Sequence, residues 1–174
     1  MEEMREKGQG ENSDGMKYNI RELGASERKE LDTFLYEAIF IPDGVEAPPK
    51  EIILQPESQV YVRDFGKRKG DKCFVAEVDS KIVGSVWVRI MNDYGHVDDE
   101  TPSLAISLLK DYRGYGIGTK LMQRMLEALK YDGYKQVSLS VQKSNYAKKM
   151  YRKVGFEVID ENCEEYIMVC RLIL

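Results

Sequence analysis

Cysteines are few in this sequence and are not arranged in pairs. Only three of the 174 residues are cysteine, Cys73, Cys163 and Cys170, and none of them forms a C-x-x-C pair. An odd number without paired spacing argues against a disulfide framework and against a zinc site. The sequence therefore predicts a protein of a reducing, cytoplasmic setting that holds no metal.

Long apolar runs and a strong charge of either sign are also missing. No apolar run approaches the roughly 18 residues that span a bilayer, so no membrane partner is expected. The formal charge is −4, and residues 1–15 hold five acids and two bases, which leaves −1 for the rest. A nearly neutral domain argues against electrostatic binding to nucleic acid or to an anionic membrane.

The composition is sufficient for one hydrophobic core. Hydrophobic residues make up 43% and charged residues 32% of the chain, and at this length a second domain would be cramped. We expect a single domain over residues 16–174. Residues 1–15 are polar, contain glycine and show no periodicity, so they are interpreted as a disordered leader or a cloning remnant.

Apolar periodicity predicts helices and strands in a mixed order. Helical spacing begins after Ala25, with Ser26 as the cap, and ends at Pro42. A less regular helix is expected over residues 50–65, and Ser144 is expected to cap a short one. Alternating patterns predict strands over residues 17–22, 73–78, 81–91, 104–109, 136–141, 156–160 and 165–174. Together these elements predict the α/β (α+β) class with a mixed, largely antiparallel sheet.

The stretch Leu104–Leu129 holds the most informative pattern. A strand pattern runs to Leu109, the six residues Arg113–Gly118 read R-G-Y-G-I-G, and apolar residues at helical spacing follow. Glycine lacks a Cβ, so a ligand can approach the main chain and positive φ angles are permitted. The N–H groups at the helix start then point outward, where the helix dipole favours negative charge. The pattern therefore indicates a phosphate-binding loop.

The spacing of the glycines excludes two common phosphate motifs. G-x-x-x-x-G-K-[ST] fails because Thr119 precedes Lys120, and G-x-G-x-x-G fails because the glycines run G-x-G-x-G. Neither a nucleotide triphosphatase nor a dinucleotide-binding domain is supported. A tight turn from strand to helix, without any ligand, remains an alternative explanation of the three glycines.

Two segments together resemble the GNAT superfamily of N-acetyltransferases. Motif A of that family, [QR]-x-x-G-x-[GA], is matched by Arg113, Gly116 and Gly118. Motif B resembles the segment VQKSNYAKKMYRKVGF, in which the matching residues are Asn145, Ala147, Tyr151, Gly155 and Phe156. Two linked motifs are more specific than either alone, and the order of strands and helices is similar from about Lys17 onward.

The resemblance implies a fold and a cofactor. The fold would be a mixed, largely antiparallel sheet of about seven strands, flanked by about four helices and splayed at the strands that bind acetyl-CoA. The pyrophosphate of coenzyme A would lie on the loop amides and its pantetheine arm along the preceding strand. The implied cofactor-binding residues are Ile106, Ser107, Leu108, Arg113, Gly114, Tyr115, Gly116, Ile117, Gly118, Thr119 and Asn145.

The resemblance also implies that Tyr151 is the catalytic acid. A phenol with an ordinary pKa near roughly 10 can give a proton to the leaving thiolate if it lies within hydrogen-bond reach. The residues by themselves allow simpler roles: Tyr151 as a core residue, Asn145 as a helix cap, and Arg113 as a brace of the loop.

The general base is not assigned by the sequence. An acceptor ammonium must lose a proton before it attacks, and the candidates are a water chain or the residues His96, Asp98, Asp99 and Glu100. The strand pattern Leu104–Leu109 carries no carboxylate, although several members of the family place one there.

We therefore expect an N-acetyltransferase that moves an acetyl group from acetyl-CoA to a primary amine by direct attack. No cysteine has a histidine nearby in the sequence, which argues against an acyl-enzyme. The alternatives are a non-catalytic acetyl-CoA-binding or sensing module on the same fold, and a nucleotide-binding domain. The acceptor, a small molecule or a peptide amine, would be bound by residues 40–50 and 91–101, and the apolar last strand would permit a homodimer.

Overall fold

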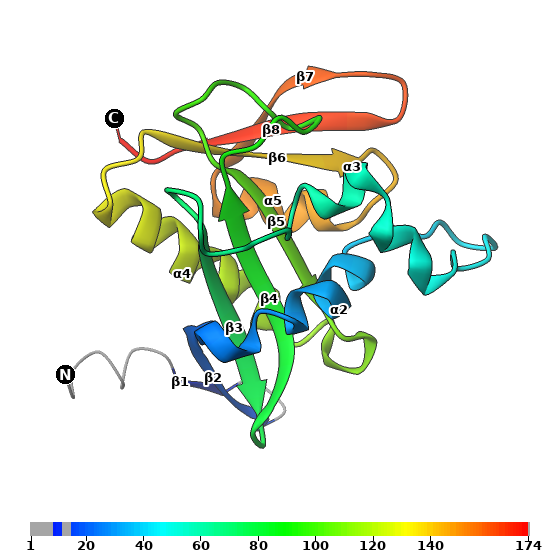
Figure 1. The fold of residues 1–174 in the computed structure, drawn as a ribbon, viewed down its shortest axis with the longest axis vertical. Helices are drawn as coiled ribbons and strands as arrows, with labels where there is room; N and C mark the ends of the chain where they lie inside the picture. Colours follow the sequence, from blue (N-terminus) through cyan, green and yellow to red (C-terminus); the bar gives the residue numbers. More distant parts are fainter. Residues whose placement is uncertain (1–8, 12–14, 174) are drawn as a thin grey trace.

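A sheet of eight strands forms the centre of the fold (Figure 1). The computed structural model describes residues 9–11 and 15–173. Across the sheet the strands follow the order β1-β2-β3-β4-β5-β6-β8-β7, and every neighbouring pair is antiparallel except β5 and β6. The bounds are β1 Gln9–Glu11, β2 Lys17–Glu22, β3 Lys72–Val78, β4 Lys81–Arg89, β5 Ser103–Leu108, β6 Gln136–Gln142, β7 Phe156–Glu161 and β8 Glu165–Arg171.

Seven of these strands are the ones that the sequence predicts, and the mixed sheet confirms the α/β class. The eighth strand, β1, lies inside the segment 1–15 for which disorder was expected. It pairs with β2 in antiparallel register, with Gly10 opposite Tyr18. Residues 1–8, 12–14 and 174 lie outside the described residues.

Within the described residues, four α-helices and three 3₁₀ turns accompany the sheet. The α-helices are α2 Glu30–Glu37, α3 Pro56–Gln59, α4 Ile117–Tyr131 and α5 Ala147–Val154, and the turns are η1 Ala25–Glu27, η2 Lys50–Leu54 and η3 Lys110–Tyr112. Among residues 9–11 and 15–173, no helix combines the length and the apolar character that crossing a membrane requires.

Both faces of the sheet are covered, which explains the nearly continuous apolar runs of β3 and β4. Phe74 and Val86 pack on one face with the buried side of α4, whereas Val75 and Trp87 pack on the other face with Phe34 of α2. Successive side chains of a strand point to opposite faces, so a strand covered on both sides carries apolar residues throughout. The hairpin between β3 and β4 turns at two adjacent residues with positive φ, Asp79 and Ser80, as a two-residue turn with right-handed strand twist requires.

The helical segment before β3 differs from the prediction. The first helix divides into η1 and the shorter α2, and Ser26 lies inside η1, where a carboxylate oxygen of Glu27 accepts the N–H of Gly24 at 2.9 Å. The expected helix over residues 50–65 consists of η2 and one turn of α3, followed by further turns. Pro56 occupies the first position of α3, where the absence of an N–H costs nothing.

A buried ion pair fastens this irregular segment to the sheet. Arg89 of β4 and Asp71 are both fully buried, and the two guanidinium nitrogens lie 3.0 Å from the two carboxylate oxygens. The same guanidinium donates to the carbonyl oxygens of Val60 and Arg63 at 3.2 and 2.6 Å. The position of residues 60–63 over the sheet is therefore fixed by a side chain of β4.

The sheet opens between β5 and β6. The only register pair between these parallel strands joins Ser103 to Ser138, while β5 pairs with β4 along its whole length. The N–H of Leu109 bonds to Val83 on the β4 side and the carbonyl of Pro102 bonds to Ser138 on the β6 side. Main-chain groups of successive residues alternate in direction, so the N–H and C=O of Ile106 face the gap. The predicted splay is thus present.

Candidate active site

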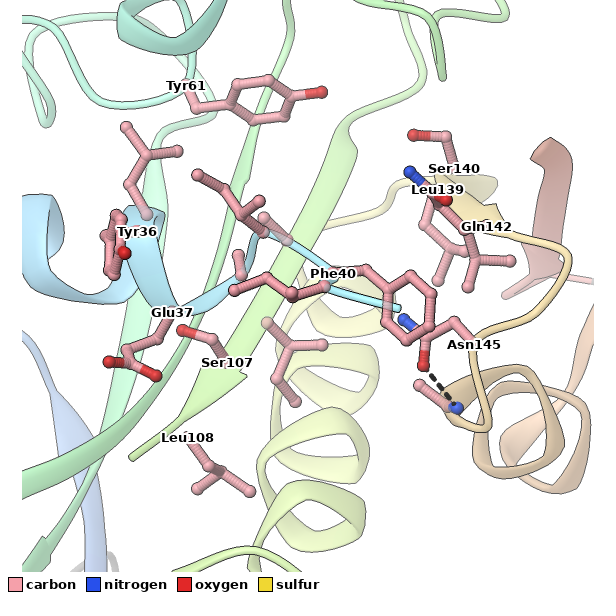
Figure 2. A pocket seen from close by; sticks show the side chains of 18 of the residues that line it. Tyr36, Glu37, Phe40, Tyr61, Ser107, Leu108, Leu139, Ser140, Gln142 and Asn145 are labelled. Carbon is pink, nitrogen blue, oxygen red and sulfur yellow. Dashed lines mark hydrogen bonds between the residues drawn. The ribbon is translucent and has the colours of Figure 1, made fainter. Parts of the chain in front are cut away.

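A cleft of about 960 Å³ occupies the gap between β5 and β6. Its walls are the end of α2 with the loop that follows, strand β5, the second half of β6, and the start of α5. Figure 2 shows Glu37 and Tyr36 on one wall, Leu139 and Gln142 on the opposite wall, and Phe40 between them. Tyr61 and Leu108 lie toward opposite ends of the view.

The glycine loop lies at the N-terminus of α4, next to the end of β5. Gly114 and Gly116 both have φ of +84°, and an added Cβ at either position would have no atom within 4 Å. Within the described residues, none of the turn and loop hydrogen bonds is donated by the main-chain N–H groups of residues 114–119. A fifteen-residue helix adds its dipole to these free donors. The loop can therefore bind an anion such as a pyrophosphate.

Arg113 is used inside the protein. Its Nε donates to the carbonyl oxygen of Leu108 at 2.9 Å, and a terminal nitrogen lies 3.0 Å from a carboxylate oxygen of Glu37. This side chain joins the start of the loop to the end of α2, which corresponds to the brace that the sequence allowed.

The three predicted strand residues all line the cleft. Ile106 and Leu108 are partly buried against the core beneath α4, and both line the cleft. Ser107 points to the other face, where its hydroxyl donates to the carbonyl oxygen of Phe34 at 2.6 Å. Ser107 therefore fixes α2 beside β5, and the main chain of Ile106 presents the free edge.

Asn145 has the capping role that the sequence allowed. Its Oδ1 accepts the N–H of Ala147 at 2.9 Å at the start of α5, so Asn145, and not Ser144, supplies the side-chain cap (Figure 2). Asn145 also lines the cleft, and its amide nitrogen takes no part in that cap. This leaves the two N–H donors of the amide nitrogen for a ligand.

Tyr151 lies on α5 with 8% of its surface exposed and lines the same cleft. Burial raises its pKa to about 12, so the phenol is protonated at neutral pH. Its ring packs at 6.1 Å from that of Phe156. The hydroxyl has no hydrogen-bond partner among the described residues, which is unusual for a buried tyrosine.

The four residues named as candidate bases do not line the cleft. A carboxylate oxygen of Asp98 accepts from the hydroxyl of Thr101 and the N–H of Glu100, and these bonds lower the pKa of Asp98. His96 Nδ1 lies 2.9 Å from the carbonyl oxygen of Met91, and Asp99 is almost fully exposed. His96 and Asp99 line a separate hollow on the surface.

Several residues that line the cleft belong to no sequence motif, so the sequence did not predict them. Tyr61, from the irregular segment, donates its hydroxyl to Asp93 at 2.9 Å, and the hydroxyl of Ser103 donates to the other oxygen of that carboxylate. Burial, followed by the charge of Asp93, raises the pKa of Tyr61. Glu165, the first residue of β8, also lines the cleft.

The described residues fit coenzyme A in three respects: a loop of free N–H donors, an unpaired strand edge on β5, and a cleft between β5 and β6. Within the described part of the chain, no group of three or more His, Cys, Asp or Glu side chains could hold a metal ion.

In this molecule the mixed sheet opens between β5 and β6, and the glycine loop precedes α4. Together these features define an α/β fold that can bind an anion at the start of a helix. The sequence model of the acetyltransferase (GNAT) domain family matches residues 33–168, and the chain belongs to this family.

Curated relatives match part of the chain. A probable N-acetyltransferase, camello, of Xenopus tropicalis is 38% identical over 89 residues, which cover 49% of this chain and 38% of that protein. An N-alpha-acetyltransferase of Sulfurisphaera tokodaii is 36% identical over 96 residues, 49% of this chain and 56% of that protein. The chain thus spans about half the length of the curated relatives it matches.

Solved structures share the fold. The GNAT domain of S. lividans PAT has a TM-score of 0.70 at 14% identity and covers 94% of this chain and 96% of its own. The PaiA N-acetyltransferase of Thermoplasma acidophilum, solved in complex with coenzyme A, has a TM-score of 0.66 at 20% identity, with 88% and 98% covered.

Proposed function

We propose that this protein transfers an acetyl group from acetyl-CoA to a primary amine by direct attack, without an acyl-enzyme. The observation that carries the proposal is the free edge of β5, which leads from the glycine loop into the cleft lined by Tyr151. A pantetheine arm can pair with such an edge as an additional strand would. The relatives named as N-acetyltransferases support this proposal.

The chain's own groups have separate tasks. The N–H groups of residues 114–119 bind the pyrophosphate, the main chain of Ile106 holds the pantetheine amides, and the free amide nitrogen of Asn145 donates to the cofactor. Acetyl-CoA supplies the activated thioester. These contacts fix the thioester carbonyl in the cleft, where an amine approaches from the side of Tyr61.

Tyr151 gives its phenolic proton to the thiolate that leaves. Its raised pKa does not oppose this role, because the apolar surroundings that destabilise the phenolate destabilise a thiolate in the same place as well. The cysteines do not suit a covalent route: Cys73 and Cys170 are buried, and none of the three lines the cleft.

The test is release of free thiol from acetyl-CoA with a panel of primary amines. Tyr151→Phe should lower kcat by roughly 100-fold or more, while acetyl-CoA binding measured by calorimetry stays unchanged. Tyr131→Phe is the matched control, because Tyr131 is 92% exposed and lies outside the cleft. Equal turnover of the two variants would show that Tyr151 is not the catalytic acid.

The alternatives give different results. A non-catalytic binding or sensing module would bind acetyl-CoA and release no thiol with any amine. A nucleotide-binding domain would be stabilised more by ATP or NAD than by coenzyme A in thermal unfolding.

A further inference from the structure

The charged side chains of the cleft divide between its two ends. Lys110 and Arg113 belong to the connection between β5 and α4, beside the glycine loop. Glu57 belongs to α3 and Glu165 to the start of β8, away from that loop. Glu37, the remaining acid of the lining, pairs with Arg113 at 3.0 Å, so these two charges cancel and Lys110 supplies the positive charge at that end. An anionic cofactor is thus favoured at one end and a cation at the other.

Glu165 lies on the sheet face that carries the 92–103 connection. It is opposite Gln142 in the pairing of β6 with β8, and two residues further on Ile167 is opposite Ser140. On the same face of β6 the hydroxyl of Ser138 donates to the carbonyl oxygen of Gly95 at 2.7 Å. The carboxylate of Glu165 has no hydrogen-bond or ion-pair partner among the described residues.

The surrounding groups leave this carboxylate available. The neighbouring acid, Asp93, already accepts from the hydroxyls of Tyr61 and Ser103, so its two oxygens are occupied. Tyr61 and Glu165 line the same cleft, and the negative charge of Glu165 contributes to the raised pKa of Tyr61. Glu165 is therefore the free acceptor in an acidic, tyrosine-lined part of the cleft.

A second feature of the same cleft points to a ligand. Tyr151 is more than nine-tenths buried, lines the cleft, and has no hydrogen-bond partner among the described residues. A buried hydroxyl without a partner costs about 1–3 kcal/mol. A ligand that reaches both residues could donate a hydrogen bond to the carboxylate of Glu165 and accept one from the hydroxyl of Tyr151.

We propose that Glu165 binds a cationic primary amine as the acceptor and is the general base that removes its proton. This inference rests on the proposed acetyl transfer and adds the proton acceptor and the charge of the substrate. The ammonium group enters between the carboxylate and the ring of Tyr61, where it is attracted by the charge and by the aromatic face.

The protons balance as follows. The carboxylate takes one proton from R–NH₃⁺, and the free amine forms a C–N bond to the acetyl carbon. The C–S bond breaks, and the thiolate takes the proton of Tyr151. The tyrosinate then takes the second proton from the new amide nitrogen, and Glu165 releases its proton to water. Each cycle gives one amide, one free thiol and one proton.

The proposal requires a definite pH dependence. Burial, followed by the charge of Glu164, raises the pKa of Glu165. The other ionisable groups on this side are Tyr61 with Asp93 behind it, Glu57 of the same cleft lining, Tyr94, Asp160 of β7, which pairs with Ile167, and Lys143. A protonated carboxyl cannot accept the ammonium proton, so kcat/KM falls on the acid side as the pH drops through the pKa of Glu165.

The experiment compares Glu165→Gln with Glu164→Gln, since Glu164 is adjacent, exposed and absent from the cleft lining. With a cationic primary amine, Glu165→Gln should lower kcat/KM by roughly 100-fold or more and remove the acid limb of the pH profile. Glu165→Asp should keep that limb at a reduced rate. Acetyl-CoA binding, measured by calorimetry, should be the same in all variants, which shows that they are folded.

Two results would overturn the proposal: equal kcat/KM of Glu165→Gln and Glu164→Gln, or an acid limb that persists in Glu165→Gln. Failure of the proposed function looks different. In that case the unmodified protein releases no thiol with any amine, although it binds acetyl-CoA.

Discussion

The two sides of the cleft are built in different ways. The proposed cofactor side comes from two continuous stretches, residues 103–119 and 136–151, each of which runs from a strand into a helix. The proposed acceptor side is assembled from distant segments, as in the bonds of Tyr61 to Asp93 and of Arg89 to Asp71. Residue spacing therefore predicts the first side, whereas the second depends on long-range contacts.

The largest effect on stability is expected at the buried ion pair of Arg89 and Asp71, which holds residues 60–63 over the sheet. Arg89→Met leaves the buried carboxylate of Asp71 without its cationic partner and removes two bonds to main-chain carbonyls, which should cost about 3–5 kcal/mol of unfolding free energy. Thermal unfolding should shift down by roughly 6–20 °C.

The control is Arg21→Met. Arg21 also contacts two carboxylates, those of Glu27 and Glu77, but its side chain is 32% exposed. A loss of about 1 kcal/mol or less is expected there. At a temperature where both variants are folded, acetyl-CoA binding should be unchanged, and weakened binding in Arg89→Met would show that the two sides are not independent.

The glycine loop gives the next largest effect. Gly116 and Gly133 lie at opposite ends of α4, both have positive φ, and neither has an atom within 4 Å of an added Cβ. An alanine in this backbone conformation costs about 1–2 kcal/mol, so Gly116→Ala and Gly133→Ala should lose similar stability. Only Gly116→Ala should raise the Kd for acetyl-CoA, by roughly tenfold, which corresponds to about 1.4 kcal/mol. Calorimetry separates the two variants, and equal affinities would mean that the loop is a turn only.

Asn145→Asp separates capping from cofactor binding. The aspartate keeps the oxygen that accepts from Ala147 and loses the amide donor. Unfolding free energy should change by less than about 0.5 kcal/mol, while acetyl-CoA affinity should fall by the value of one hydrogen bond, about 1 kcal/mol. Unchanged affinity for acetyl-CoA would show that Asn145 acts only as a helix cap.

The smallest effect lies outside the cleft. The guanidinium of Arg21, together with the N–H of Gly24, lowers the pKa of Glu27 to about 2 from 4.5. A pKa lowered by folding contributes stability above the unfolded value, and this contribution is lost as the pH falls from about 4.5 toward 2. Glu27→Gln should be less stable by up to about 1 kcal/mol at pH 7. Urea unfolding should show this difference closing over that range, with thiol release at pH 7 unaffected.

Much of the cofactor side could be predicted from the sequence. Arg113, Gly116 and Gly118 predicted a loop at a helix N-terminus, and the structure places them there. Alternation predicted seven of the strands. These are local properties, since a turn, a helix start or a strand face depends on residues within a few positions.

The sequence by itself thus determined the strand–loop–helix unit and, through the second motif, the position of Tyr151 on the following helix. It did not predict the proposed base, because Glu165 is distant from Tyr61 along the chain and follows no helical or strand pattern in common with it. Only the tertiary structure, with β8 inserted between β6 and β7 and with Arg89 holding residues 60–63 in place, brings that carboxylate into the cleft. The physical reason is that the chemistry of the acceptor side depends on distances across the sheet, which residue spacing along a chain does not encode.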